Sequence, residues 1–436
     1  MIKEDLLQYI WQFQQFSKRK IMTTQGHELK VIKPGQPNKN SGPDFSDAHI
    51  LINGKSFYGQ IEVHVDSSSW YTHHHHQNKA YDHVVLHVVW NDDKPVIHTD
   101  GTTLPTLLIK NYINLKLLAR YTLLSQSSSP IPCANHLQKT TKKTWRTMLE
   151  KALLQRLSDK CRLVHQLWEA NKNDAEATAY QLLANNFGFK INSQVFLHLS
   201  KCIPLKLVQK NAKSLLHLEA LFLGQAGLLP TNSMTAKINQ STNPYLHTLI
   251  QTHHYLTHKY KLATSIDKSQ WKFSRLRLAN SPFIRITQFA SLLHQHHSLF
   301  YLLINTPTQQ LHQALAIKQS HYWQTHYQLD KKSKKPISRL GQRSIDNIII
   351  NTVVPILATY GKLHHNEYYI NRALDILVAL PAEQNSITKK WQKLNIPIPN
   401  ALASQGSLEL FNHFCSLRKC LSCDIGKLIM RKNNTD

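Results

Sequence analysis

Long hydrophobic runs are absent from this sequence, and so is the pattern of a secretory leader. No apolar stretch approaches the roughly 20 residues that a membrane-spanning helix needs, so we expect no membrane span. The opening MIKEDLLQYIWQF contains acidic residues and predicts a short amphipathic helix, not a basic segment followed by an apolar core. Both absences predict a cytoplasmic protein.

Acidic residues are scarce. The 436 residues include 26 Asp and Glu against 52 Lys and Arg, which gives a formal net charge of +26. An excess of this size indicates a polyanionic partner, most often nucleic acid, although an anionic membrane surface satisfies the same electrostatics. The alternative is a basic soluble protein without such a partner. The oligomeric state is not indicated.

Cysteine is also rare, with six in the chain, and a reducing compartment disfavours structural disulfides. Three of the six, Cys415, Cys420 and Cys423, form a C-x4-C-x2-C pattern within the last 22 residues. Such a trio predicts a zinc or iron–sulfur site that ties the chain's end to its N-terminal domain. Cys133 is the first choice for the fourth ligand and His413 the second. The alternative is a set of buried thiols without a metal.

Internal repeats and long low-complexity linkers are missing as well, so the pattern of hydrophobic residues defines the domains. Residues 1–130 predict an α+β domain with a mixed sheet, and residues 141–436 predict a large, mainly α-helical domain. The main expected elements of the first domain are a helix over 2–15, strands over 47–52 and 56–65 joined by a turn at Asn53-Gly54, and a buried strand over 84–89.

Two carboxylates in the first domain are candidates for a metal site. Because side chains alternate along a strand, Glu62 and His64 share one face, and Asp44 could reach Glu62 across the hairpin. Paired carboxylates suit a hard cation. The alternative is that Asp44 caps a turn and Glu62 lies on a solvated face. The histidine run 73–76, with His64, His87 and Asp82, could hold zinc or manganese instead.

Several motifs together resemble an uncharacterised bacterial family, domain of unknown function 2851. The resemblance covers essentially the whole chain, and the family name implies no activity. The motifs are DLLQYIWQF, GPDF, GQIEVHV, YDHVVLHVV, NNFGFK, EALFLGQAGLL, RLRLANSPFIRITQFA, NTVVPILATYG and LPAEQNSI.

The order of elements in the first domain is similar to the core of the PD-(D/E)XK nucleases. Pro43-Asp44 corresponds to "PD" and Glu62-Val63-His64 to "(D/E)XK", with His64 where lysine is usual. The resemblance implies that Asp44 and Glu62 hold Mg²⁺ or Mn²⁺, which activates a water for phosphodiester hydrolysis. His64 would act as base or charge stabiliser. The cysteine trio with a distant fourth likewise resembles the iron–sulfur staple of certain helicase-associated nucleases.

Basic residues in the second domain are candidate phosphate contacts. Arginines interleaved with aromatics could hold a nucleic-acid backbone, and so could a lysine-rich loop. The alternatives are arginines that cover the core and a solvated loop. The candidates are Arg275, Arg277, Arg285, Lys331, Lys332, Lys334 and Lys335. The sequence thus predicts a metal-dependent nuclease of DNA or RNA. The alternative is a non-catalytic nucleic-acid-binding or scaffold protein stabilised by a cysteine-bound metal.

Overall fold

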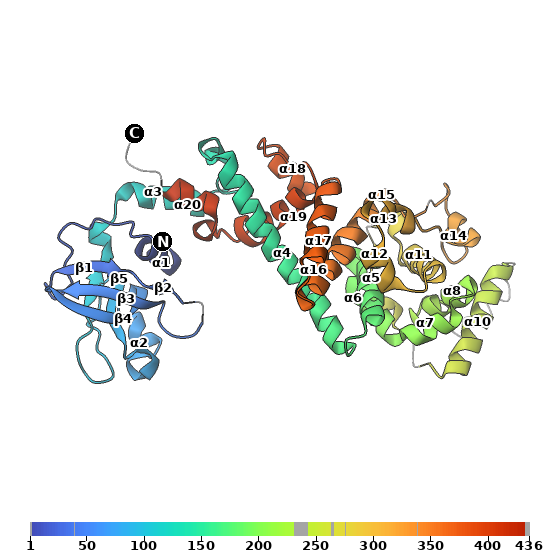
Figure 1. Ribbon diagram of the computed structural model, residues 1–436, viewed down its shortest axis with the longest axis horizontal. Helices are drawn as coiled ribbons and strands as arrows, with labels where there is room; N and C mark the ends of the chain where they lie inside the picture. The colour runs from blue at the N-terminus through green and yellow to red at the C-terminus, as the bar shows by residue number, and fades with distance from the viewer. Residues whose placement is uncertain are drawn as a thin grey trace. The chain divides into compact units, whose positions relative to one another are not determined.

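The computed structural model describes residues 2–38, 40–230, 243–262, 266–274, 276–337 and 339–431 (Figure 1). The chain divides into two compact units. The N-terminal unit consists of the residues up to Leu149 together with the segment from Leu410 onward, and the helical unit is Glu150–Glu409. The C-terminal segment therefore groups with the N-terminal unit. Within the described residues, no helix is both long and apolar enough to cross a membrane.

The N-terminal unit is built around a mixed sheet, as the sequence predicts. Its strand order is β1-β3-β4-β5-β6, and β2 pairs with the first two residues of β3, Phe45 and Ser46. The β1–β3 and β3–β4 pairs are antiparallel, whereas the β4–β5 and β5–β6 pairs are parallel. The strands are β1 (Leu29–Lys33), β2 (Gln36–Pro37), β3 (Phe45–Ile52), β4 (Lys55–Asp66), β5 (Val84–Asn91) and β6 (Thr106–Leu108).

The predicted hairpin joins β3 to β4. Asn53 and Gly54 have φ values of 47° and 76°, the left-handed values that a two-residue turn requires. Farther along β4, Ile61 and Val63 are fully buried, in the stretch of the strand that pairs with β5. Gly59 lies where β5 begins, and a Cβ there would approach the carbonyl oxygen of His83 to 2.4 Å. The close approach of the two strands therefore requires glycine at this position.

Helix α1 (Glu4–Gln12) packs on this sheet through an apolar stripe. Leu6, Leu7, Ile10 and Trp11 are fully buried, and Trp11 Nε1 donates a hydrogen bond to the Pro34 carbonyl at 2.9 Å. Glu4 and Gln8, four residues apart, lie on one side of the helix. Docking of the apolar stripe therefore fixes where these two polar side chains point.

Short helices and turns complete the N-terminal unit. Helix α2 lies in the crossover between the parallel strands β4 and β5, which a tight turn cannot connect. The remaining elements are α2 (Ser69–Thr72), 3₁₀ turns His75–Gln77, Lys79–Tyr81, Ile109–Tyr112 and Ala134–Lys139, α3 (Leu115–Ser125), the π-helical turn Leu410–Cys415, the 3₁₀ turn Cys420–Ser422 and α20 (Asp424–Arg431). Helix α4 (Lys142–Ala170) contains the boundary between the two units.

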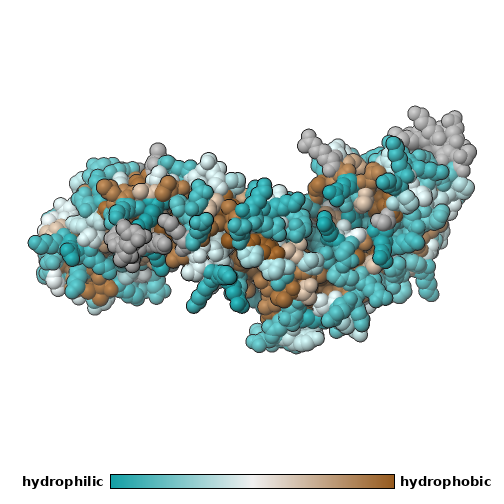
Figure 2. Space-filling model, turned by 90° about the horizontal axis from the view of Figure 1, so that it is seen from above, coloured by the Kyte–Doolittle hydropathy of each residue, from teal (hydrophilic) through white to brown (hydrophobic). Residues whose placement is uncertain are grey.

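The helical unit has one large apolar core, in which α11 is buried from Pro282 to Leu293. Hydrophilic residues cover much of each unit on the face in Figure 2. The helices are α5 (Ala175–Phe187), α6 (Phe189–Cys202), α7 (Leu205–Asn211), α8 (Leu215–Gln225), α10 (Pro244–Tyr260), α11 (Pro282–Gln295), α12 (Leu299–Asn305), α13 (Thr308–Ala314), α14 (His321–Thr325), α15 (Gln342–Ile348), α16 (Val354–Leu363), α17 (Glu367–Ala379), α18 (Ser386–Gln392) and α19 (Ala401–Glu409). Shorter elements are the 3₁₀ turns Lys268–Gln270 and Leu278–Asn280, the π-helical turn Ile349–Val353, and the strand pair β7 (His326–Gln328) and β8 (Lys331–Lys332).

Candidate functional site

Two carboxylates meet where β3 begins beside the middle of β4. The backbone N–H of Asp44 donates to Glu62 Oε2 at 3.0 Å, and the backbone N–H of Val63 donates to Asp44 Oδ2 at 3.1 Å. A β-bulge between Phe45 and Ala48 bends the start of β3 at this point. The structure thus brings together the two acidic residues that the sequence singles out.

Helix α1 adds a third carboxylate to this site. Gln8 Nε2 donates to Asp44 Oδ1 at 2.9 Å and to Glu4 Oε1 at 3.3 Å, so Gln8 links the helix to the hairpin. Sequence reasoning missed Glu4. Its signal is the four-residue spacing from Gln8 on the polar side of an amphipathic helix, together with its place before the "PD" hairpin.

The carboxylates lie in an environment that disfavours their charge. Burial, and then the charge of Glu62, raises the pKa of Asp44 to about 7. Burial also raises the pKa of Glu62 to about 8, and the nearby charge of Glu4 adds to this. In the described part of the chain, no lysine or arginine pairs with Asp44 or Glu62. The cluster therefore lacks the positive charge that would favour its ionised form.

The other carboxylate oxygen of Glu62, Oε1, lies next to two imidazoles. His64 Nε2 and His75 Nε2 each lie 3.3 Å from Glu62 Oε1, and His73 Nδ1 lies 3.2 Å from His64 Nε2. The ligand nitrogens of His64, His73 and His75 all lie within 4.8 Å of one another. From the histidine run, the structure thus selects positions 73 and 75, on either side of His74, which has a left-handed φ of 58°.

His87 orients this group from β5. Its Nε2 lies 2.8 Å from His64 Nδ1, and both side chains are almost completely buried. Burial lowers the pKa of His64 well below its usual value and that of His87 to about 3, so both are neutral at pH 7. Asp82, the other predicted partner, instead accepts a hydrogen bond from the Thr99 hydroxyl at 2.6 Å and is exposed.

The predicted four cysteines also come together, in the N-terminal unit. None forms a disulfide; Cys133, Cys415 and Cys423 are buried and Cys420 is half-buried. Burial raises the pKa of Cys133 to about 12, with further contributions from Cys423 and Cys420, and raises that of Cys415, with contributions from the other three. His413, the second choice for the fourth ligand, is exposed.

Arg418 fastens the cysteine-bearing segment to the chain before Cys133. Its two terminal nitrogens donate to the carbonyls of Ser129 and Ser127, each at 2.8 Å. Gly426 in α20 packs so closely that a Cβ there would approach the Cys420 carbonyl oxygen to 2.1 Å. The C-terminal segment is therefore joined to the residues around Cys133 by contacts other than the thiols.

The predicted phosphate contacts have different surroundings. Arg275 lies outside the described residues, and Arg277 is exposed. The lysines at 331, 332, 334 and 335 are also exposed, although 331 and 332 form strand β8 and not a loop.

The guanidinium of Arg285 is largely engaged by neighbouring side chains. It is buried, donates hydrogen bonds to Gln288, Asn280 and Ser344 at 2.9, 2.5 and 3.1 Å, and lies over the Phe189 ring. Arg285 also lines a small pocket of about 170 Å³ together with Phe189 and Asn280. Its burial supports the alternative interpretation, in which Arg285 covers the apolar core.

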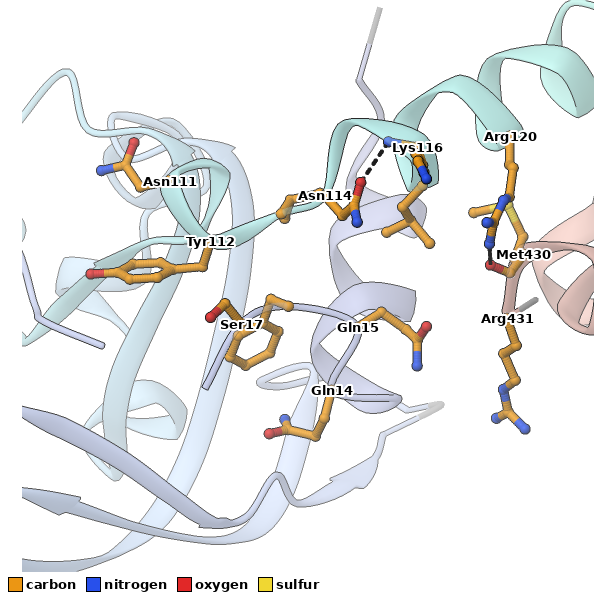
Figure 3. A pocket seen from close by; sticks show the side chains of 13 residues that line it. Gln14, Gln15, Ser17, Asn111, Tyr112, Asn114, Lys116, Arg120, Met430 and Arg431 are labelled. Carbon is orange, nitrogen blue, oxygen red and sulfur yellow. Dashed lines mark hydrogen bonds between the residues drawn. The ribbon is translucent and has the colours of Figure 1, made fainter. Parts of the chain in front are cut away.

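A basic pocket of about 520 Å³ lies in the N-terminal unit and was not predicted (Figure 3). Lys116 and Arg120 come from α3 and Arg431 from α20, whereas the loop after α1 contributes Gln14 and Gln15. Arg120 Nη1 donates to the Met430 carbonyl at 3.1 Å, which joins two walls of the pocket. Among the described residues no acidic side chain lines it, so it suits an anion.

The chain belongs to the family described as protein of unknown function (DUF2851), which matches residues 4–386. No curated protein and no solved structure matches the chain.

Proposed function

We propose that the N-terminal unit is a metal-dependent phosphodiester hydrolase that acts on DNA or RNA. The observation that carries this proposal is the meeting of half-buried Asp44 and buried Glu62, with which no lysine or arginine of the described residues pairs. The order of α1, an antiparallel β-hairpin, a crossover and the parallel strand β5 supports it, because the PD-(D/E)XK core has the same order.

The residues present fit a divalent cation. Buried, mutually repelling carboxylates are stabilised by a cation, so Asp44, Glu62 and the carbonyl between Glu62 and His64 are its expected ligands. The ion would supply polarisation of a phosphoryl oxygen and a lowered pKa of a water. Val63 N–H and Gln8 fix the Asp44 carboxylate, and the Asp44 N–H fixes Glu62. Neutral His64 lies beside Glu62, where an imidazole can orient or accept a proton from a water.

The basic surface supports a nucleic-acid substrate. Lys116, Arg120 and Arg431 line one pocket of the unit that contains the carboxylates, and the whole chain carries a net charge of +26. Each phosphate that a lysine or arginine neutralises releases counterions from the nucleic acid, which favours binding. This pocket is therefore a better first candidate for phosphate contact than Arg285.

The four cysteines are proposed to hold a structural metal centre. A single zinc ion with bonds of about 2.3 Å requires its sulfurs to lie about 3.8 Å apart. Within the described residues, the group His64–His73–His75 alone has three or more ligand atoms that all lie within 4.8 Å of one another. No three of the described thiols lie that close together, and the proposed centre is either a zinc ion or an iron–sulfur cluster.

Asp44→Ala and Glu62→Ala should each reduce nucleic-acid cleavage at least about 100-fold, because each removes charge and geometry from the ion. The assay uses labelled single-stranded and double-stranded DNA and RNA with Mg²⁺, Mn²⁺, Zn²⁺ or Fe²⁺. Circular dichroism and nucleic-acid binding should stay close to wild type. Glu28→Ala is the matched control, since Glu28 is an exposed carboxylate just before β1.

A second candidate function is a non-catalytic nucleic-acid-binding scaffold. Histidine at position 64, where the nuclease pattern has lysine, favours it. Binding of nucleic acid by a wild-type protein that cleaves no substrate with any of the four metals would support the scaffold and overturn the hydrolase.

A further inference from the structure

We propose that the centre at Glu62 is a transition-metal site with the ligands Glu62 Oε1, His64 Nε2, His73 Nδ1 and His75 Nε2. This inference goes beyond the proposed function: it shares Glu62 with the carboxylate site but uses His64 as a ligand and omits Asp44, and it does not require that the protein hydrolyse anything. It differs from a Mg²⁺ site made of carboxylates, because three of the four ligands are imidazoles.

Three of the distances among these four atoms match the spacing of neighbouring ligands around one ion. With metal–ligand bonds of about 2.1 Å, neighbouring ligand atoms lie about 3.0 Å apart in an octahedral shell and about 3.4 Å apart in a tetrahedral one. The distances are 3.3 Å from His64 Nε2 to Glu62 Oε1, 3.3 Å from His75 Nε2 to the same oxygen, and 3.2 Å from His64 Nε2 to His73 Nδ1. All three distances fall within this interval.

The surroundings hold two of the imidazoles in the orientation of ligands. When His64 Nδ1–H donates to His87 Nε2, 2.8 Å away, the lone pair of His64 Nε2 points to the centre, as in many metal-bound histidines. The His75 ring stacks on Tyr81 with centroids 3.7 Å apart and meets the Trp70 ring edge-on. Both rings are therefore fixed before an ion arrives.

The ligand set decides which metals fit. Imidazole suits zinc, iron, nickel and copper, whereas Mg²⁺ prefers oxygen ligands and keeps several waters. His73 is exposed whereas His64 and His75 are buried, so the centre is open to solvent on the His73 side. An open side is what a catalytic metal requires for its water or substrate.

Calorimetric titration of the full-length protein with Zn²⁺ or Mg²⁺, after mild chelation and without substrate, tests this inference. We expect a Zn²⁺ site that Mg²⁺ does not occupy, and His73→Ala should weaken Zn²⁺ binding to it at least about tenfold. His64→Lys should do the same, although a lysine would keep a nuclease of the usual pattern active. His74→Asn is the matched control, because asparagine tolerates a left-handed φ.

Equal binding of Mg²⁺ and Zn²⁺, or unchanged Zn²⁺ binding in His73→Ala, would overturn the inference. An equal loss in His74→Asn would show adventitious binding by the histidine run and would overturn it too. Because His73 is exposed, its substitution leaves the packed core intact, and circular dichroism checks this. A protein that binds Zn²⁺ as expected and cleaves no nucleic acid would retain the metal site and contradict only the hydrolase.

Discussion

Glu62 is the residue on which the candidate site depends. One of its oxygens accepts the backbone N–H of Asp44, and the other faces His64 and His75. Each oxygen thus belongs to a different set of ligands, carboxylates on one side and imidazoles on the other. The proposed hydrolase and the proposed choice of metal both follow from this double role, and they can fail separately.

Glu219, a buried carboxylate in the helical unit, has a structural role. The Tyr245 hydroxyl donates to its Oε2 at 2.7 Å, and Trp323 Nε1 donates to the same hydroxyl at 2.9 Å. Burial raises the pKa of Glu219 to about 7. The folded chain therefore takes up a proton, between about pH 4.5 and 7, that the unfolded chain does not bind. The free energy of unfolding should rise as the pH falls through 7, and this increase should be complete near pH 4.5.

Glu219→Gln removes this proton uptake and keeps an acceptor for the Tyr245 hydroxyl. At pH 8 the variant should be more stable than wild type by on the order of 2 kcal/mol, with little difference at pH 5. Urea denaturation at both pH values measures this. Glu176→Gln is the control variant. The Glu176 carboxylate accepts two backbone N–H groups of α12, so its substitution should not make the protein more stable at pH 8. A difference that is the same at pH 5 and pH 8 would contradict the assignment to Glu219.

At the scale of elements, local patterns were predictable and long-range contacts were less so. Asn53-Gly54 predicts the hairpin because few other dipeptides adopt two left-handed φ values, and the hairpin is confirmed. The alternation along β4 places Glu62 and His64 on one face for the same local reason. These parts of the candidate site depend on neighbours in sequence.

Other parts of the site depend on packing that no local pattern contains. Glu4 reaches the site only because the apolar stripe of α1 docks on the sheet. The choice of His73 and His75 from four histidines follows from the turn at His74. Arg285 is buried because α11 is packed on all sides. The pattern of arginines and aromatic residues in the sequence does not predict this burial.

The C-terminal segment is the element whose loss should matter most to the N-terminal unit. Cys420→Ser should lower the melting temperature more than Cys161→Ser, because loss of a thiolate ligand forfeits the folding free energy coupled to the metal. Cys161 is the matched control, a half-buried thiol whose Sγ lies 3.8 Å from the Pro355 carbonyl oxygen in the helical unit. Metal analysis and visible absorbance should show a loss of zinc or of iron–sulfur colour in Cys420→Ser alone. If wild-type protein is as stable without metal as with it, a structural metal centre at the four cysteines is contradicted.

At the scale of the whole molecule, the large positive net charge is the feature that should control nucleic-acid binding. A net charge of +26 should make nucleic-acid binding fall steeply as salt rises, with a slope that counts the phosphates neutralised. If no nucleic-acid binding is detected at low salt, on the order of 50 mM, both the nuclease and the nucleic-acid-binding scaffold are contradicted.

Within this charge, the basic pocket should contribute a distinct share. Lys116→Ala should weaken binding uniformly across sequences and lower the salt slope by about 1, the effect of one lost phosphate contact. Lys55→Ala, at the tip of the β3–β4 hairpin and outside the pocket, is the matched control. Fluorescence anisotropy over a series of salt concentrations measures both slopes. Equal slopes for wild type and Lys116→Ala would exclude the pocket as a phosphate site.

The measurement that tests the central claim most directly is cleavage in water enriched in ¹⁸O. Hydrolysis by an activated water places one ¹⁸O atom on the product phosphate, which mass spectrometry of the cleaved oligonucleotide detects. We predict this label with wild-type protein loaded with metal, and its loss together with cleavage in Asp44→Ala but not in Glu28→Ala. Wild-type protein that yields no labelled product with any divalent metal, or Asp44→Ala that yields as much as wild type, would contradict the account.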